Sequence, residues 1–305
     1  MSKLRKKIEF LFLALFPILM GCSADDSLVL LPDEQEEESM EIQLLATTSA
    51  QADAIITRIG DNGFEIGDKL GVYSEELFEN TLFTLEEDYF IAEETCHFPL
   101  GKERLTLSAY YPYSETIADN LLPVKNNVVY VDNPAWTNAT SDPLWATNTI
   151  EEPTRNQDKQ TTDIIVPLNF KHQLARLQLK TDEDVQIKNI VITFNDTQYG
   201  YMDIATGEIT SAQPDAQQSI TWIMASIENG TNTSTGINID GLFLPNEDAI
   251  ASIKVNLDGI QKEIFPTDAI NHIELKSGTI TTIKISKGSN AATRSNNEIC
   301  LNIEE

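Results

Sequence analysis

The chain is predicted to be all-β, with two tandem β-sandwich domains that follow a leader and an acidic tether. Short runs rich in β-branched and aromatic residues recur from residue 41 onwards. Gly, Asn, Asp and Pro separate these runs, and almost no stretch has the 3.6-residue period of a helix. We expect strands at residues 42–48, 69–73, 104–111, 127–131, 164–170, 174–179, 187–194, 219–224, 237–244, 252–257 and 279–286, and single helical turns at 75–80 and 214–218.

The first 21 residues have the pattern of an export signal. A basic stretch at residues 3–7 precedes an apolar run at 10–20, which is shorter than the about 20 residues that cross a bilayer. The sequence Leu-Met-Gly-Cys that ends at Cys22 resembles a bacterial lipobox. We therefore expect residues 1–21 to be removed and Cys22 to be lipidated; the alternative is an uncleaved membrane anchor with an incidental cysteine.

Charge narrows the choice of partners. After residue 21 the chain has 17 basic and 47 acidic residues, and this excess of negative charge disfavours nucleic acid as a partner. Residues 22–40 are interpreted as a solvated acidic tether. Within this tether, residues 23–26 (SADD) resemble the signal that sends lipoproteins of some Gram-negative anaerobes to the outer surface, so we expect a lipid anchor in the cell outer membrane.

The remaining chain is divided near residue 171. Pro167 closes one apolar run, and the alternating segment at 174–179 opens the next. We therefore predict an N-terminal domain at 41–170 and a C-terminal domain at 171–305.

Catalytic signals are scarce. His97, His172 and His272 are isolated, and no nucleophile elbow, phosphate loop, dinucleotide fingerprint or metal-binding spacing occurs. Apart from Cys22 only Cys96 and Cys300 remain, and one bridge between them is left open. The prediction is therefore no catalytic residue, no metal and no cofactor, so the chain is not expected to be an enzyme.

Four ordered segments carry a family resemblance. They are TRIG with FEIGDKLGVY (57–60 and 64–73), AYYPY (109–113), SDPLWA (141–146) and LNFKHQLARL (168–177). With the lipobox, they resemble the fimbrillin family, the pilin-like surface lipoproteins of gut and oral anaerobes, which implies transthyretin-like, Greek-key sandwiches. A purely structural interpretation also fits these segments: a turn at Gly67 and Asp68, an edge strand around Tyr110 and Tyr111, and Trp145 as a core anchor.

The resemblance implies a mode of assembly. A surface protease would cut between Arg58 and Ile59, the first strand would leave, and a strand from a neighbouring subunit would fill the vacated groove. The C-terminal segment 297–305 alternates Ile299, Leu301 and Ile303 and could be that donor strand. The alternative is that it completes its own sheet, and it lacks the tryptophan that the family often carries there.

The leading function is therefore a structural fimbrillin-like subunit of a fimbrium that acts in cell adhesion as shaft, anchor, tip or accessory component. Its expected partners are other fimbrillin subunits, the surface protease and a host or bacterial surface ligand. An alternative is a glycan-binding surface lipoprotein that uses Tyr110, Tyr111, Trp136 and Trp222. A secreted hydrolase is the weakest candidate, because no nucleophile and base are visible together.

Overall fold

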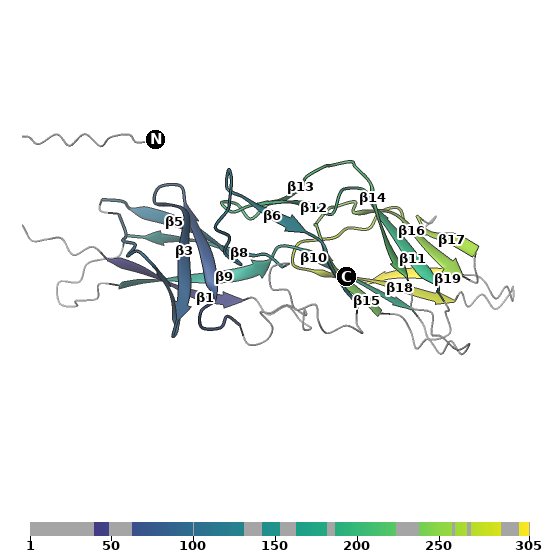
Figure 1. Ribbon diagram of the computed structural model, residues 1–305, viewed down its shortest axis with the longest axis horizontal. Coiled ribbons are helices and arrows are strands. Elements are labelled where there is room, and N and C mark those ends of the chain that lie inside the picture. Colours follow the sequence, from purple (N-terminus) through teal and green to yellow (C-terminus); the bar gives the residue numbers. More distant parts are fainter. Residues whose placement is uncertain are drawn as a thin grey trace, which may run out of the picture. The chain divides into compact units, whose positions relative to one another are not determined.

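The computed structural model describes residues 40–48, 63–99, 101–130, 142–152, 163–181, 187–223, 238–257, 260–266, 270–287 and 299–304. Strands are the only regular elements of this part of the chain, which confirms the all-β prediction (Figure 1). The strands are β1 (Glu41–Thr48), β2 (Lys69–Ser74), β3 (Phe78–Glu86), β4 (Tyr89–Ala92), β5 (Arg104–Tyr111), β6 (Leu121–Lys125), β7 (Asn127–Tyr130), β8 (Leu144–Glu151), β9 (Asp163–His172), β10 (Ala175–Thr181), β11 (Asn189–Phe194), β12 (Tyr199–Asp203), β13 (Ile209–Ser211), β14 (Gln218–Ile223), β15 (Asn238–Phe243), β16 (Ile250–Leu257), β17 (Ile260–Phe265), β18 (Ile280–Lys287) and β19 (Ile299–Glu304).

Seven strands of the N-terminal half close into a barrel in the order β1-β4-β3-β2-β5-β8-β9. Neighbouring strands are antiparallel except β1 and β9, which run parallel. Alternate side chains point inwards, so that Leu70, Val72, Phe83, Leu107 and Phe170 are almost fully buried in one core.

The C-terminal half packs a five-stranded sheet (β19-β18-β10-β15-β7) against a four-stranded sheet (β14-β11-β16-β17). Leu177, Leu179 and Ile283 come from the first sheet, and Ile190 and Ile253 from the second; all are buried in a common core. The β-branched residues of these strands suit a pleated surface that is buried on one face. This packing is the expected β-sandwich.

Strands from the two halves also pair with each other. β9 ends at His172 and β10 begins at Ala175, close to the expected boundary, but β6 pairs with β12 and β7 pairs with β15. Residues Ser39–Glu305 form one compact unit. The division at residue 171 therefore stays a prediction, with β6 and β7 assigned by sequence to one half and bonded to the other.

Two local expectations were wrong. Residues 75–80 and 214–218 are not helical: Leu77 donates to the Ser74 carbonyl and Ala216 to the Gln213 carbonyl in tight turns, after which β3 and β14 begin. In the first segment β3 already begins at Phe78, and in the second Asp215 has a positive φ of 61° and donates its backbone N–H to the Asp196 side chain, so neither continues as a helical turn.

The tyrosine-rich strand is not an edge strand either. β5 lies between β2 and β8, and Tyr110 is fully buried. Its ring lies over Gly71, its partner on β2, where a Cβ atom would come within 2.1 Å of the ring. The phenol donates to Asn80 at 2.7 Å. Glycine opposite the aromatic residue therefore makes room for it inside the sheet.

Candidate functional site

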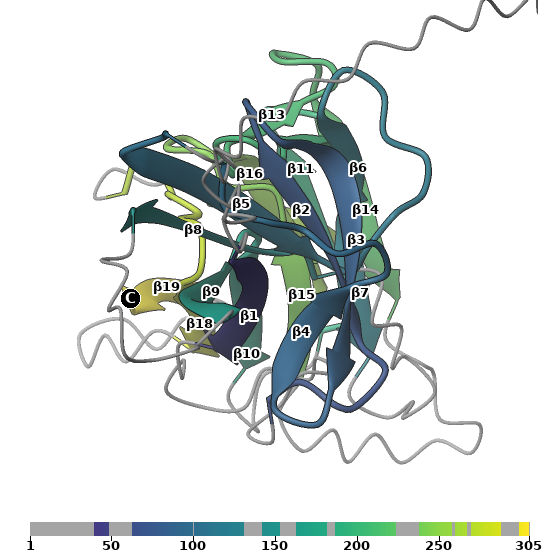
Figure 2. The ribbon, with the colours of Figure 1, turned by 90° about the vertical axis from the view of Figure 1, so that its left-hand side faces the viewer.

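β1 is bonded on both sides, but unequally. It pairs in parallel with β9 from Glu41 to Thr48, and the two strands lie side by side in Figure 2. On the other side it pairs with β4 only at Leu44 and Phe90. Two further hydrogen bonds join its beginning to the chain after β4, from Ile42 N to Cys96 O (2.8 Å) and from Phe98 N to Met40 O (2.9 Å). Most of the main-chain bonding of β1 is therefore made with one neighbour.

The side chains of β1 complete the barrel core. Ile42 and Leu44 are 1% and 0% exposed, and Ala46 packs partly buried against the same cluster, whereas Leu45 and Thr47 face outwards. Each fully buried aliphatic side chain contributes about 1.5–3 kcal/mol. The apolar side chains of β1 therefore close the barrel core between β4 and β9.

The segment predicted as a donor strand forms β19 at the edge of the five-stranded sheet. It pairs antiparallel with β18, from Ile299 opposite Lys287 to Glu304 opposite Thr282. Leu301 is half-buried against the C-terminal core. Ile299 and Ile303 lie in the same strand, and their side chains are outside the described residues. In the monomer residues 299–304 thus complete a sheet of their own chain, which was the alternative to strand donation. Donation requires β19 to separate from β18 first.

Other predicted site residues lie outside the described part of the chain. These are the lipidation residue Cys22 and the two residues of the processing bond, Arg58 and Ile59. Cys96 is a free thiol, and burial, followed by Glu41 and Glu94, raises its pKa. The thiolate that would attack a disulfide or metal is therefore disfavoured at Cys96.

The aromatic residues of the glycan-binding alternative do not form an exposed platform. Tyr110 and Tyr111 are 0% and 4% exposed and belong to the barrel and its neighbouring core. Trp136 and the side chain of Trp222 lie outside the described residues. Stacking on a sugar needs a ring face in contact with solvent, which neither tyrosine has.

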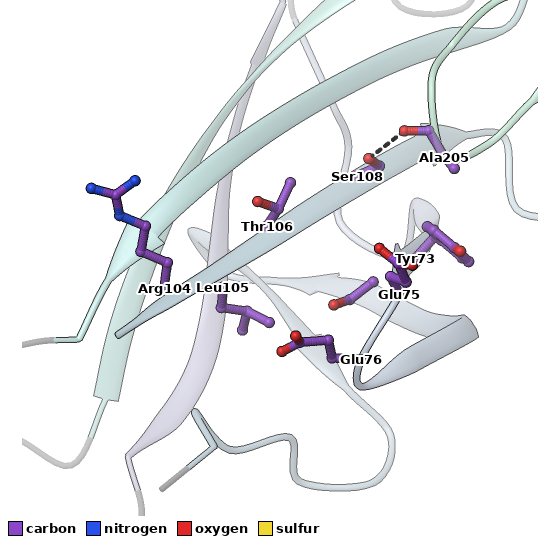
Figure 3. A pocket seen from close by; sticks show the side chains of 9 residues that line it. Tyr73, Glu75, Glu76, Arg104, Leu105, Thr106, Ser108 and Ala205 are labelled. Atoms are coloured by element: carbon purple, nitrogen blue, oxygen red, sulfur yellow. Dashed lines mark hydrogen bonds between the residues drawn. The ribbon is translucent and has the colours of Figure 1, made fainter. Parts of the chain in front are cut away.

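A polar pocket of about 300 Å³ lies at the outer side of the barrel, between the end of β2, β5 and the turn after β12 (Figure 3). Ser108 Oγ closes one end by donating to the Ala205 carbonyl at 2.9 Å, and Glu76 on the rim is paired with Lys102 at 2.7 Å. The lining has carboxylates, hydroxyls and the guanidinium of Arg104, and it contains no histidine or cysteine. No group of three metal-binding side chains occurs among the described residues.

One polar pair was missed by sequence reasoning. His172, at the end of β9, places Nδ1 2.6 Å from Asp142 Oδ2, and both side chains are buried. The two residues lie in the segments SDPLWA and LNFKHQLARL, which were interpreted only as features of the fold. Their proximity could not be expected because 30 residues separate them.

No described helix is long and apolar enough to cross a membrane.

Comparisons with known proteins agree with this architecture. A family model described as fimbrillin-like matches residues 57–300. A candidate fimbrium subunit of Bacteroides uniformis, Fim1C, is 24% identical over 295 residues, which cover 88% of this chain and 87% of that protein.

Two crystal structures share the fold at low sequence identity. A candidate cell-adhesion protein from Bacteroides uniformis has a TM-score of 0.51 at 19% identity, with 87% of this chain and 96% of that chain covered. A similarly described protein from Bacteroides ovatus has a TM-score of 0.51 at 15% identity, with 88% and 96% covered.

Proposed function

Because the chain belongs to the fimbrillin-like family, whose members are fimbrial structural proteins and not enzymes, we propose that it is a fimbrial subunit that assembles by exchange of its first strand. In this proposal a surface protease cuts between Arg58 and Ile59, β1 leaves, and a neighbour's strand enters between β4 and β9. The chain would act in cell adhesion through the assembled fibre, with other fimbrillin subunits as its main partners and with no catalysis of its own.

The position of β1 is the observation that carries the proposal. β1 supplies two fully buried side chains to the barrel, yet its main chain is laddered to β9 along one side and touches β4 at a single register pair. A cut in the segment between Thr48 and Gly63 would separate β1 covalently from the barrel. Strand addition is an efficient means of joining subunits because main-chain bonds supply affinity and alternate side chains fill pockets.

β19 supports the second half of the proposal. An edge strand has only one hydrogen-bonded neighbour, so separating it breaks one ladder instead of two. Its alternation of Ile299, Leu301 and Ile303 parallels that of Ile42, Leu44 and Ala46 in β1. Strand exchange would thus replace one apolar row with another.

The leader supports assembly at the cell surface. In the proposal Cys22 carries the lipid that holds the precursor in the outer membrane, and the tether at 22–40 gives the protease access. Whether the subunit becomes shaft, anchor, tip or accessory component depends on the fate of this anchor.

Treatment of the purified chain with an arginine-specific protease tests the proposal. We expect a heat-resistant ladder of polymers on a denaturing gel, and loss of the ladder in Arg58→Ala with an unchanged melting midpoint. Arg155→Ala is the matched control and should polymerise like the parent protein. A ladder of equal intensity in Arg58→Ala would show that Arg58 is an ordinary surface charge.

A further inference from the structure

β9 is the wall along which β1 lies, and its own attachment to the barrel is short. β1 pairs with β9 at eight positions from Glu41 to Thr48. On its other side β9 pairs with β8 only at Leu144 with His172 and at Trp145 with Lys171. Without β1, the main-chain pairing of β9 within the barrel would be confined to its last two residues.

Pro167 is one position at which β9 cannot donate a main-chain hydrogen bond to β8. Its carbonyl accepts a hydrogen bond from Asn148 Nδ2 of β8 at 2.8 Å, so this carbonyl faces β8. The N–H and C=O of one residue point to the same side of a strand, and proline lacks the N–H. β8 therefore receives no donor at this position, and a side-chain amide takes the place of a strand partner.

The anchored end of β9 carries the buried Asp142 and His172 pair. His172 Nδ1 lies 2.6 Å from Asp142 Oδ2, and the side chains are 7% and 6% exposed. Gln173 N donates to the Pro143 carbonyl at 3.0 Å beside the pair. Asp142 Oδ1 has no hydrogen-bond partner among the described residues. Among the described residues His172 is therefore the one hydrogen-bond partner of this buried carboxyl group, and separating β9 from β8 would break that bond.

We propose that the buried Asp142 and His172 pair is the anchor that holds β9 against β8 as the fixed wall of the groove when β1 is absent. The inference rests on the proposed function, since it assigns positioning residues to the same groove. The pair does not touch the incoming strand; it acts through β9, whose Val166, Leu168 and Phe170 line the core side of the groove.

The anchor is tested first in the uncut chain, where neither processing nor assembly matters. Hydrogen exchange should be at least about tenfold faster for the β1 and β9 amides in Asp142→Ala than in the parent, corresponding to about 1.4 kcal/mol of local opening. Asp142→Asn keeps the shape and an acceptor oxygen and should restore most of the protection. Exchange at β11 and β16 should not change. Unchanged exchange at β9 would overturn the proposal.

The second test asks whether the anchor matters for strand uptake. A recognition site for a sequence-specific protease is placed within residues 49–57, so that β1 is released without reliance on Arg58. A fluorescent peptide of residues 40–48 is then added back. We expect at least about tenfold weaker peptide binding in Asp142→Ala and His172→Ala.

The control is Val255→Ala in the C-terminal core. Its peptide binding is compared with that of Asp142→Ala at a temperature where the two variants have lost the same free energy of unfolding. If general destabilisation were the cause, peptide binding would be weakened equally in Val255→Ala. That result would overturn the proposal that Asp142 and His172 anchor β9. Failure of the released parent protein to rebind the peptide would instead contradict strand exchange, provided that its β9 exchange responds to Asp142→Ala as expected.

Discussion

β1 and β19 have the same apolar alternation but opposite roles in the monomer. β1 is bonded to β9 and β4 and buries Ile42 and Leu44 completely in the barrel. β19 is bonded to β18 alone and leaves Leu301 half-buried at the side of the sandwich. The two strands therefore share an apolar alternation and differ in the number of neighbouring strands that hold them.

The two strands therefore differ in what their removal does. Loss of β1 would open the barrel between β4 and β9 and expose its apolar core to water, and in the proposed assembly a replacement strand covers that core. Loss of β19 uncovers the edge β18 and part of one core, while the order of the other strands in both sheets is kept. A subunit that accepts at one position and donates from the other needs this asymmetry.

The largest expected effect on stability comes from truncating Leu44 of β1, compared with the same truncation of Leu301 in β19. Leu44→Ala should lower the free energy of unfolding of the uncut chain by about 2–5 kcal/mol, because it leaves a cavity in the barrel. Leu301→Ala should cost about 1 kcal/mol, because only part of that side chain leaves water on folding. Urea denaturation measures both, and equal losses would remove the distinction between the two strands.

A smaller effect is expected at Tyr110, which has no counterpart at the sheet edge. Burial raises its pKa to about 12, so the folded phenol stays neutral between pH 10 and 12 while the unfolded phenol ionises. The parent protein should lose stability across this range. At pH 8, Tyr110→Phe should be about 1 kcal/mol less stable through loss of the bond to Asn80, and this gap should narrow as pH rises. A stability difference between the two proteins that stays constant to pH 12 would contradict a raised pKa of Tyr110 in the folded state.

The smallest effect should be found on the outward face of β1. Leu45 is 39% exposed and lies beside Pro167 of β9. Leu45→Thr should change the free energy of unfolding by no more than about 0.5 kcal/mol, since no core contact is lost. Denaturation of this variant beside Leu44→Ala separates the two faces of one strand. A loss as large as that of Leu44→Ala would mean that the outward face is also packed.

Sequence reasoning succeeded where the pattern is local. The alternation of Ile42 and Leu44 correctly predicted a half-buried strand. Pro167, expected to close an apolar run, instead lies inside β9, which continues to His172. Gly67 has a positive φ of 89°, which fits the expected turn before β2. The strand and this turn are each determined by a few consecutive residues.

Features that depend on distant partners could not be predicted. The pairing of β6 with β12 joins residues more than 70 positions apart, and the space for Tyr110 depends on Gly71. Asp142 and His172 come into contact only because the end of β9 pairs with the beginning of β8. No periodicity records such contacts, because they are set by the order of strands in a sheet.

The central claim is that β19 must leave β18 to enter a neighbour. Ser286 lies opposite Cys300 in the register of the two strands, so Ser286→Cys offers a disulfide that staples β19 in place. The variant is made with Cys22→Ser and Cys96→Ser so that no other thiol competes, and Ser286→Ala in the same background is the control. After β1 has been removed, the account predicts no polymer ladder from the oxidised staple and a full ladder after reduction. Equal ladders in both states, with the staple shown to be closed, would contradict donation by β19.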